Sequence, residues 1–306
     1  MVVSLIFHYL SLIPVFQYVV NFAQDFIIGI LKTGPIPHHV AFVMDGNRRY
    51  AKNNTMALKE GHNAGLETLV KVLDFSYRLG IKAVTIYAFS IENFNRPKLE
   101  VDTLFELLKS KLVYISQSGE YADKHGIKIK IIGNKSMIPE EILKDLNKVE
   151  EKTLKNKTFL LNVCFPYTSR DDITNCIIKI VKKVKEEKTI SIDEIDEDLL
   201  NEHMYFGNEY PNVDVLVRTS GHTRLSDFML WQTNKDSVIT FDNSLWPEFG
   251  FINYMNIILK YSYYKNLQLQ QIKFKPKKSK NDTQIANNNI EELINNHPPY
   301  ASVTGN

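Results

Sequence analysis

The chain has 306 residues, of which 44% are hydrophobic and 24% are charged, and its formal net charge is +2. This composition indicates a globular protein with a sizeable core and excludes a disordered chain. The small net charge excludes strong steering by the whole chain and favours no nucleic-acid partner, so an anion site must be a local cluster. The two cysteines, Cys164 and Cys176, form no disulfide framework and favour a reducing compartment.

Residues 1–34 form a hydrophobic segment with no charged side chain before Asp25. Its few polar residues recur at helical spacing on one narrow stripe, which predicts a membrane-associating helix. Three arrangements remain open: a helix in the membrane interface, a membrane span, or a helix packed on protein. A signal peptide is excluded because the segment lacks a basic start and a small-residue cleavage site.

An uncharged apolar run that ends in Asp45 predicts a buried strand. Gly46 and Asn47 can form the turn after it, and a helix is expected to begin near Arg48. The free N–H groups of a helix start suit a phosphate, and Asp45 at the strand end suits a hard cation that bridges to phosphate oxygens. The alternative is that Asp45 caps the helix and that Arg48 and Arg49 are solvated.

A helical pattern follows residues 61–65 and ends at Gly80, which is well placed as the residue after the helix. His62, at the predicted start of this helix, either meets the same anion as Arg49 or faces solvent. A second buried strand is predicted over residues 82–88.

The loop after this second strand carries a hydroxyl, an amide, a carboxylate and a guanidinium, from Ser90, Asn93, Glu92 and Arg96. Ligands of open α/β sheets bind beyond the carboxyl ends of the strands, so the two strand ends predict one crevice. The alternative is a turn with an asparagine cap and a surface arginine.

The next helix, over residues 101–115, has an apolar stripe that suits either the core or a ligand tunnel. Further strands are predicted over residues 128–132 and 158–165, with a charged, exposed helix over 140–152 between them. Asp171 and Asp172 favour the first turn of another helix over a metal site.

A third cluster lies where a strand over residues 214–218 ends in Arg218 and a glycine turn leads to Arg224 and Ser226. The planar fork of arginine matches phosphate oxygens. The cluster therefore adds to the predicted anion site. A last short strand is predicted over residues 238–241.

Taken together, residues 39–52, 89–97 and 214–228 resemble the signatures of the cis-prenyltransferases, the family of undecaprenyl and dehydrodolichyl diphosphate synthases. The double arginine Arg48-Arg49 resembles the eukaryotic branch, and the chain looks like a catalytic subunit of the fungal type. The resemblance covers residues 35–268. It implies a single α/β domain with a mostly parallel sheet of about six strands, flanked by helices that enclose a hydrophobic tunnel.

The resemblance also implies the activity. The family condenses isopentenyl diphosphate repeatedly onto farnesyl diphosphate, and the long polyprenyl (dehydrodolichyl) diphosphate serves dolichol synthesis and protein glycosylation. By resemblance, Asp45 is catalytic and holds Mg²⁺, and Asn93 assists proton removal. The residues expected at the allylic diphosphate are Gly46, Asn47, Arg48, Arg49, Tyr50, His62, Ser90, Glu92, Phe94 and Arg96. The residues expected at isopentenyl diphosphate are Arg218, Arg224 and Ser226.

The chain departs from the family pattern at three places. Leu58 stands where many members have an arginine, with Lys59 beside it, and no glutamate metal ligand lies between Trp231 and Trp246. Residues 301–306 contain no Arg-x-Gly motif, which eukaryotic catalytic subunits obtain from a partner related to the Nogo-B receptor. We therefore expect a heteromer that is nearly inactive without its partner. It is expected at the cytosolic face of the endoplasmic reticulum membrane, with lipid droplets as a second location.

Residues 269–306 turn basic and then asparagine-rich, which suits either an anionic membrane surface or a solvated flexible tail. Two rival functions are weaker. A non-catalytic scaffold of the same complex is expected to lose Asp45 and the arginines, which this chain keeps. A nucleotide-binding protein or a phosphatase needs a glycine-rich phosphate loop or a nucleophile motif, and neither is found.

Overall fold

The structure is a computed structural model that describes residues 14–116, 121–208 and 211–274. The predictions for residues 1–13 and 275–306 lie outside this part of the chain. Backbone contacts divide the chain into two units, Met1–Tyr263 and Tyr264–Asn306, and the described part of the second unit is the last turns of helix α10 (Phe251–Phe274). The sheet, the helices around it and the candidate site lie in the first unit.

The core of the first unit is one sheet of six strands in the order β3-β4-β2-β1-β5-β6, and all neighbouring strands are parallel. The predicted strands are confirmed, as is the mostly parallel sheet. Their observed bounds are β1 (His39–Val43), β2 (Ala83–Tyr87), β3 (Ile127–Ile132), β4 (Phe159–Cys164), β5 (Val215–Arg218) and β6 (Val238–Phe241).

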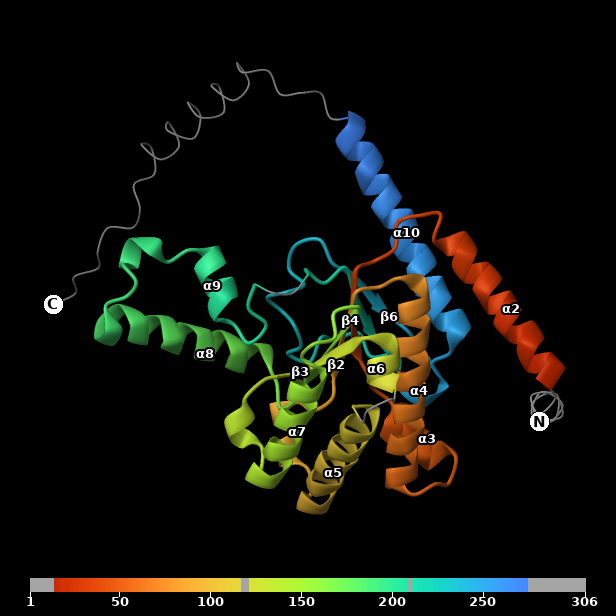
Figure 1. Cartoon of the computed structure of the whole chain (residues 1–306), viewed down its shortest axis with the longest axis horizontal. Helices are drawn as coiled ribbons and strands as arrows, with labels where there is room; N and C mark the ends of the chain where they lie inside the picture. The colour runs from red at the N-terminus through yellow and green to blue at the C-terminus, as the bar shows by residue number, and fades with distance from the viewer. Residues whose placement is uncertain (1–13, 117–120, 209–210, 275–306) are drawn as a thin grey trace. The chain divides into compact units, whose positions relative to one another are not determined.

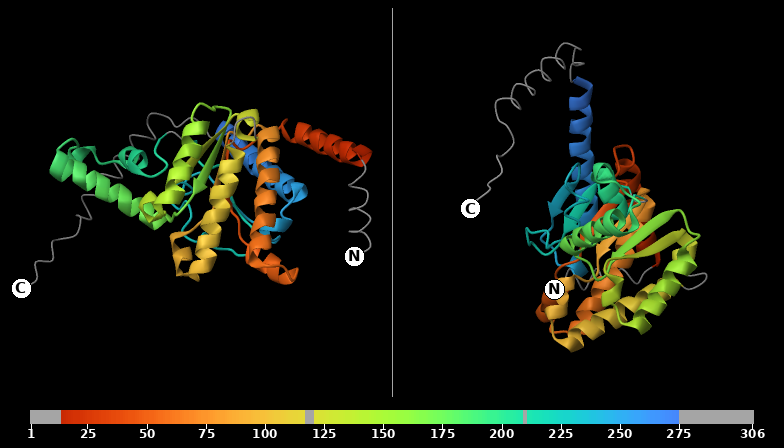
Figure 2. Two further views of the ribbon diagram at one scale, coloured as in Figure 1. Left: turned by 60° about the horizontal axis from the view of Figure 1, so that its bottom comes forward. Right: turned by 90° about the vertical axis from the view of Figure 1, so that its left-hand side faces the viewer.

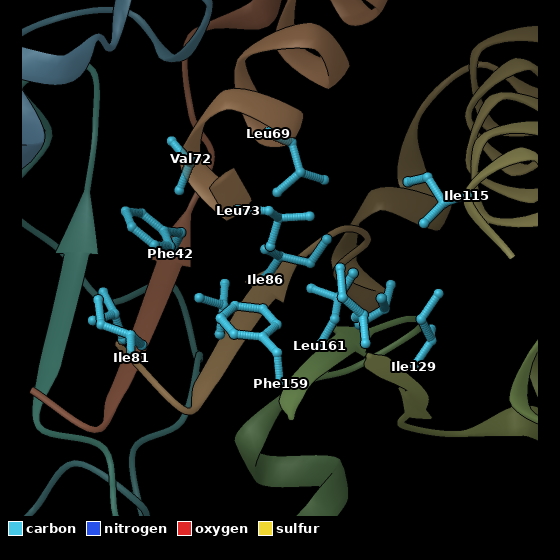
Figure 3. Close-up of a cluster of buried hydrophobic side chains, with 14 of the residues drawn as sticks. Phe42, Leu69, Val72, Leu73, Ile81, Ile86, Ile115, Ile129, Phe159 and Leu161 are labelled. Carbon is cyan, nitrogen blue, oxygen red and sulfur yellow. The ribbon is translucent and has the colours of Figure 1, made fainter. Parts of the chain in front are cut away.

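Helices cover one face of the sheet, because alternate strand residues point to that face and are apolar. Figure 3 shows Phe42, Ile86 and Leu161, from three strands, gathered under Leu69 and Leu73 of α4. Figures 1 and 2 show α4, α5 and α7 side by side on this face. The described helices are α2 (Pro14–Leu31), α3 (Asn47–Asn53), α4 (Leu58–Leu79), η1 (Ile91–Asn95), α5 (Lys98–Ile115), α6 (Tyr121–His125), η2 (Lys135–Met137), α7 (Glu140–Thr153), α8 (Ser169–Lys182), η3 (Lys183–Glu187), η4 (Ile192–Glu194), α9 (Glu197–His203), η5 (Trp246–Glu248) and α10.

The opposite face of the sheet is covered mainly by segments between regular elements. Ala41 and Leu216 there pack against Tyr167, Phe206 and Phe228. Because these segments are mostly irregular, a helical or strand pattern in the sequence does not indicate which of their side chains are buried.

A buried polar chain also lies within this second face. His39 Nδ1 bonds to the carbonyl of Pro211, and its Nε2 lies 2.7 Å from Thr85 Oγ1, which accepts a bond from Asn162 Nδ2 at 3.0 Å. Burial lowers the pKa of His39 to about 4, so the imidazole is neutral in the folded protein.

Helix α2 joins the domain through Ile28 and Leu31, which belong to the main core, and through an ion pair between Asp25 and Arg78 of α4 at 2.7 Å. Its other side carries exposed apolar side chains: Tyr18, Val19, Phe22, Phe26 and Ile30. Among the helices of residues 14–116, 121–208 and 211–274, none is both long and apolar enough to cross a membrane.

The predicted place of His62 at a helix start is wrong. Helix α4 begins at Leu58, where the Glu60 side chain accepts the N–H of Ala57 at 2.9 Å and so caps the first turn. Gly61 and Gly65 face α3, which lies so close that a side chain at either position would clash with it. A Cβ atom on Gly65 would lie 2.2 Å from Asn47 Oδ1.

Candidate active site

A cavity of about 500 Å³ lies beyond the carboxyl ends of the central strands. β1 has β2 on one side and β5 on the other, and ligands of open α/β sheets bind where the strand order reverses in this way. Most of the predicted site residues line it: Asp45, Asn47, Arg48, His62, Ser90, Glu92, Asn93, Arg96, Arg218, Arg224 and Ser226.

The centre of the cavity is an ion pair between the ends of β1 and β5. Arg218 Nη2 donates to Asp45 Oδ2 at 2.8 Å, and the Asp45 side chain is 31% exposed while that of Arg218 is 4% exposed. Burial by itself would raise the pKa of Asp45, but the hydrogen bond and charge of Arg218 outweigh it and lower that pKa. Asp45 is therefore an ionised carboxylate open to the cavity.

Arg218 also shapes the loop after β5. Its Nη1 donates to the carbonyl of Arg224 at 2.7 Å and to Ser226 Oγ at 2.5 Å. The turn before the loop is fixed by Thr219, whose hydroxyl donates to the carbonyl of Asp45 at 2.8 Å. One arginine thus joins the ends of two strands to a loop that carries a second arginine.

The loop after β2 forms the other wall through the short helix η1. Ser90 Oγ accepts the N–H of Glu92 at 3.2 Å, and Asn93 Oδ1 accepts the N–H of Ser90 at 3.1 Å. This reciprocal cap orients Asn93 so that its Nδ2 group is left for a ligand. Arg96 pairs with Glu100 at 2.9 Å and still lines the cavity. Burial, followed by the positive charge of Arg48, lowers the pKa of Arg96.

Three polar atoms of residues that line the cavity are buried without a hydrogen-bond partner within the described residues. They are Asn47 Oδ1, His62 Nε2 and Arg218 Nε. Burial, followed by the nearby charge of Arg96, lowers the pKa of His62 to about 4, so its imidazole is neutral. Buried polar atoms are normally paired, so His62 Nε2 and Arg218 Nε are candidates for hydrogen bonds to a ligand.

Other predicted site residues lie outside the cavity lining. Arg49 donates from Nη2 to the carbonyl of Ser220 at 2.9 Å, and Gly46 forms the bend before α3 with φ 115°. Phe94 packs its ring against Phe89, with ring centroids 5.0 Å apart. Tyr50, in α3, is likewise not part of the lining.

Sequence reasoning missed Arg170, Asp227 and Tyr87, which also line the cavity. Arg170 stands at the start of α8, after the end of β4. A strand-end position was the signal that identified the other clusters, and it applies here too. The Tyr87 hydroxyl lies 3.1 Å from the carbonyl of Tyr167 and 3.3 Å from that of Ser226, so these two acceptors share its one proton. Its ring stacks on Phe228 with centroids 4.4 Å apart.

Two apolar spaces flank α5. One of about 70 Å³ lies between α4 and α5, and Met44, His62 and Leu104 are among the residues that it shares with the polar cavity. Another of about 390 Å³ lies between α5 and α7 and shares Arg96 with it. The hydrophobic tunnel stays a prediction, and these two apolar spaces beside α5 are its candidates within the described residues.

Asp171 and Asp172 belong to the first turn of α8, as predicted, but the cap is Thr168, whose Oγ1 accepts the N–H of Asp171. Asp172 is buried and accepts the N–H of Tyr205 at 2.7 Å. Within residues 14–116, 121–208 and 211–274, no three His, Cys, Asp or Glu side chains are grouped so as to hold a metal ion.

The fold is an open α/β sheet of parallel strands, and the cavity at the strand ends is lined by five arginines together with the carboxylates of Asp45, Glu92 and Asp227. The family model described as "Putative undecaprenyl diphosphate synthase" matches residues 43–267. The chain therefore belongs to the cis-prenyltransferase family, which is a family of transferases.

Individual relatives agree with this assignment. The dehydrodolichyl diphosphate synthase complex subunit SRT1 of Saccharomyces cerevisiae is 44% identical over 80% of this chain and 71% of that protein. The human complex subunit DHDDS is 42% identical over 78% of this chain and 71% of that protein. Lavandulyl diphosphate synthase from Lavandula x intermedia, solved with dimethylallyl diphosphate, aligns with a TM-score of 0.68 at 32% identity, over 74% of this chain and 95% of that chain.

Proposed function

We propose that this chain is the catalytic subunit of a dehydrodolichyl diphosphate synthase. It adds isopentenyl diphosphate repeatedly to farnesyl diphosphate and makes a long polyprenyl diphosphate for dolichol synthesis and protein glycosylation. The observation that carries the proposal is the cavity itself, where Arg48, Arg96, Arg218 and Arg224 surround the carboxylate of Asp45 beside an apolar space. The positive charge of these four arginines suits two negatively charged diphosphates, and the apolar space suits a prenyl chain.

The wall formed by α3, α4 and η1 suits the allylic diphosphate. Arg48 and Arg96 approach it with guanidinium groups, and the neutral His62 offers an unpaired ring nitrogen. These groups stabilise the negative charge that develops as the diphosphate leaves. Asn93 lies beside them with its Nδ2 group free, where it can orient the substrate from which a proton is removed.

The loop after β5 suits isopentenyl diphosphate. Arg224 and the unpaired Nε of Arg218 provide donors, and Ser226 provides a hydroxyl. Holding the second substrate against the first turns their encounter into an effectively intramolecular reaction. We propose that this orientation sets which face of the double bond attacks.

We propose Mg²⁺ as the cofactor and Asp45 as its protein ligand. Asp45 fits because it is ionised and one third exposed to the cavity, and because Mg²⁺ in proteins commonly combines one or two carboxylates with substrate phosphate oxygens. When bound, Mg²⁺ would neutralise part of the charge of the leaving diphosphate. Arg218 keeps Asp45 ionised and oriented before any ligand is present.

The space between α4 and α5 is the proposed start of the hydrocarbon path. Its walls are the apolar side chains of Leu69, Leu107 and Leu108. This space of about 70 Å³ adjoins the polar cavity, with which it shares Met44, His62 and Leu104. We propose that α4 and α5 move apart to admit a growing chain.

We also propose a partner and a membrane. The yeast and human relatives are named as complex subunits, which supports a heteromer. Its second subunit is proposed to be related to the Nogo-B receptor and to complete the site with an Arg-x-Gly motif. The exposed apolar face of α2 supports attachment to a membrane surface. We propose that this surface is the cytosolic face of the endoplasmic reticulum membrane or that of lipid droplets.

The test is incorporation of labelled isopentenyl diphosphate into lipid-extractable product with farnesyl diphosphate and Mg²⁺. It compares the chain alone with the chain co-expressed with such a partner. Synthesis that requires the partner is the expected result. Strong synthesis by the chain alone would contradict the heteromer, and no synthesis in either sample would contradict the enzyme.

A further inference from the structure

Arg170 bridges the two walls of the cavity, and neither proposed diphosphate subsite includes it. Its Nη2 donates to Glu92 Oε1 of η1 at 3.1 Å, and its Nε donates to Asp227 Oδ2 of the β5 loop at 2.8 Å. All three residues line the cavity. The Arg170 side chain is 72% exposed, and its two partners differ, since the Asp227 side chain is 11% exposed and that of Glu92 is 60% exposed.

The start of α8 holds the backbone of the β5 loop as well. The backbone N–H of Arg170 donates to Asp227 Oδ1 at 3.1 Å, and that of Ser169 donates to the carbonyl of Asp227 at 2.7 Å. Ser169 Oγ accepts the N–H of Leu230 at 2.9 Å. The Asp227 carboxylate therefore receives two bonds from one residue, one from the backbone N–H of Arg170 and one from its side-chain Nε.

This loop needs such support because its backbone is strained. Ser226 and Asp227 have φ values of 52° and 59°, and Met229 has 51°, although none of them is glycine. Residues with side chains avoid this region, and they remain in it only where their surroundings hold them. The strained conformation keeps Ser226 Oγ within 2.5 Å of Arg218 Nη1.

We propose that Arg170 is a positioning residue that couples the two diphosphate subsites. Its Nε bond to Asp227 holds the loop of Ser226 at the isopentenyl diphosphate subsite. Its Nη2 bond to Glu92 connects this loop to η1 at the allylic diphosphate subsite. The bond to Asp227 contributes most of the positioning, because an exposed ion pair such as that with Glu92 contributes little free energy by itself. The inference rests on the proposed function, since it assigns the two walls to two diphosphates.

The experiment measures kcat and both KM values for the active complex with Arg170→Ala. We expect the KM for isopentenyl diphosphate to rise about tenfold, the KM for farnesyl diphosphate to rise less than threefold, and kcat to change less than threefold. Arg170→Lys keeps one charged contact and should recover part of the loss. Lys144→Ala is the control, because it removes a similarly exposed basic side chain and its ion pair with Glu140 on α7; it should leave all three constants unchanged.

A double-mutant cycle separates positioning from general weakening of the fold. Asp227→Asn should reproduce the effect of Arg170→Ala, and the two changes together should be no worse than either alone. Additive effects, an equal rise of both KM values, or no rise for Arg170→Ala would overturn the proposal. A wild-type complex that makes no product would contradict the proposed function instead. Calorimetric binding of isopentenyl diphosphate to wild type and Arg170→Ala then tests the positioning role without turnover, and equal affinities would overturn it.

Discussion

The two walls of the cavity are built in different ways. On the β1 and β2 side, Asp45 lies two residues after the end of β1 and Ser90 three residues after the end of β2. They lead into α3 and η1, so regular elements set the positions of the side chains. On the β5 side, residues 219–230 contain no helix, and four of their non-glycine residues have positive φ: Ser220, Ser226, Asp227 and Met229. Side-chain bonds from Arg218, Tyr87 and Arg170 hold this second wall.

The difference predicts two kinds of sensitivity. The regular wall depends on close packing between α3 and α4, so changes there should alter the stability of the fold together with the allylic subsite. The irregular wall depends on a few polar contacts, so changes there should alter the binding of one substrate and leave the sheet intact.

The largest effect is expected at Asp45, where the two walls meet. Asp45→Ala should lower turnover by at least about 100-fold, because it removes the carboxylate that would hold Mg²⁺ at the leaving diphosphate. Circular dichroism should show an unchanged fold, since Arg218 keeps its bonds to Arg224 and Ser226. A variant that still turned over at the wild-type rate with Mg²⁺ would remove Asp45 from the metal site.

The next effect separates the two walls. Arg218→Ala should raise the KM for isopentenyl diphosphate by at least about 30-fold, since losing the buried, hydrogen-bonded charge pair that Arg218 would form with the diphosphate costs about 2–5 kcal/mol of binding. Arg96→Ala should raise the KM for farnesyl diphosphate more than that for isopentenyl diphosphate. Equal effects of either change on the two KM values would contradict the assignment of the walls.

A packing change tests the regular wall. Gly65→Ala places a Cβ 2.2 Å from Asn47 Oδ1 and 2.9 Å from Trp246 Cδ1, so it should lower the free energy of unfolding by about 2 kcal/mol. The matched control is Gly29→Ala in α2, where nothing lies within 4 Å of the new Cβ. That helical change should raise the free energy of unfolding by up to about 1 kcal/mol. Urea denaturation measures both, and equal values for the two variants would refute close packing at Gly65.

The smallest effect concerns His39, in the second face of the sheet. Its pKa in the folded protein is about 4, below the ordinary 6.5, so the unfolded state takes up a proton first as the pH falls. The stability that neutral His39 contributes is complete above pH 6.5 and is lost as the pH falls toward 4. Between pH 7.5 and 5.5 the loss amounts to about 1.3 kcal/mol.

Urea denaturation at these two pH values should show this loss in wild type and a smaller loss in His39→Gln, which does not titrate. The comparison uses the change with pH rather than the stability itself, because the glutamine variant also alters the bonds to Thr85 and Pro211. Equal changes in the two proteins would show that His39 does not titrate within this range.

The sequence by itself determined the order of the strands along the chain and the strand ends that carry the site. Apolar runs with β-branched residues encode strands locally, and Asp45, Ser90 and Arg218 stand directly after such runs or at their ends. Gly80 could be identified as the end of a helix because it is a glycine that follows a helical apolar pattern, and its left-handed backbone, with φ 88°, confirms this. The family resemblance rested on the same local blocks.

Only the tertiary structure decided which of these side chains meet. The partners of Arg170 are 57 and 78 residues away in sequence, and the partner of Arg218 is 173 residues away. The left-handed backbone at Ser226 and Asp227 is invisible in their residue types, because contacts from α8 and Tyr87 stabilise it. Local periodicity encodes an element and its buried face, whereas a bond between distant loops forms only after the sheet has brought them together.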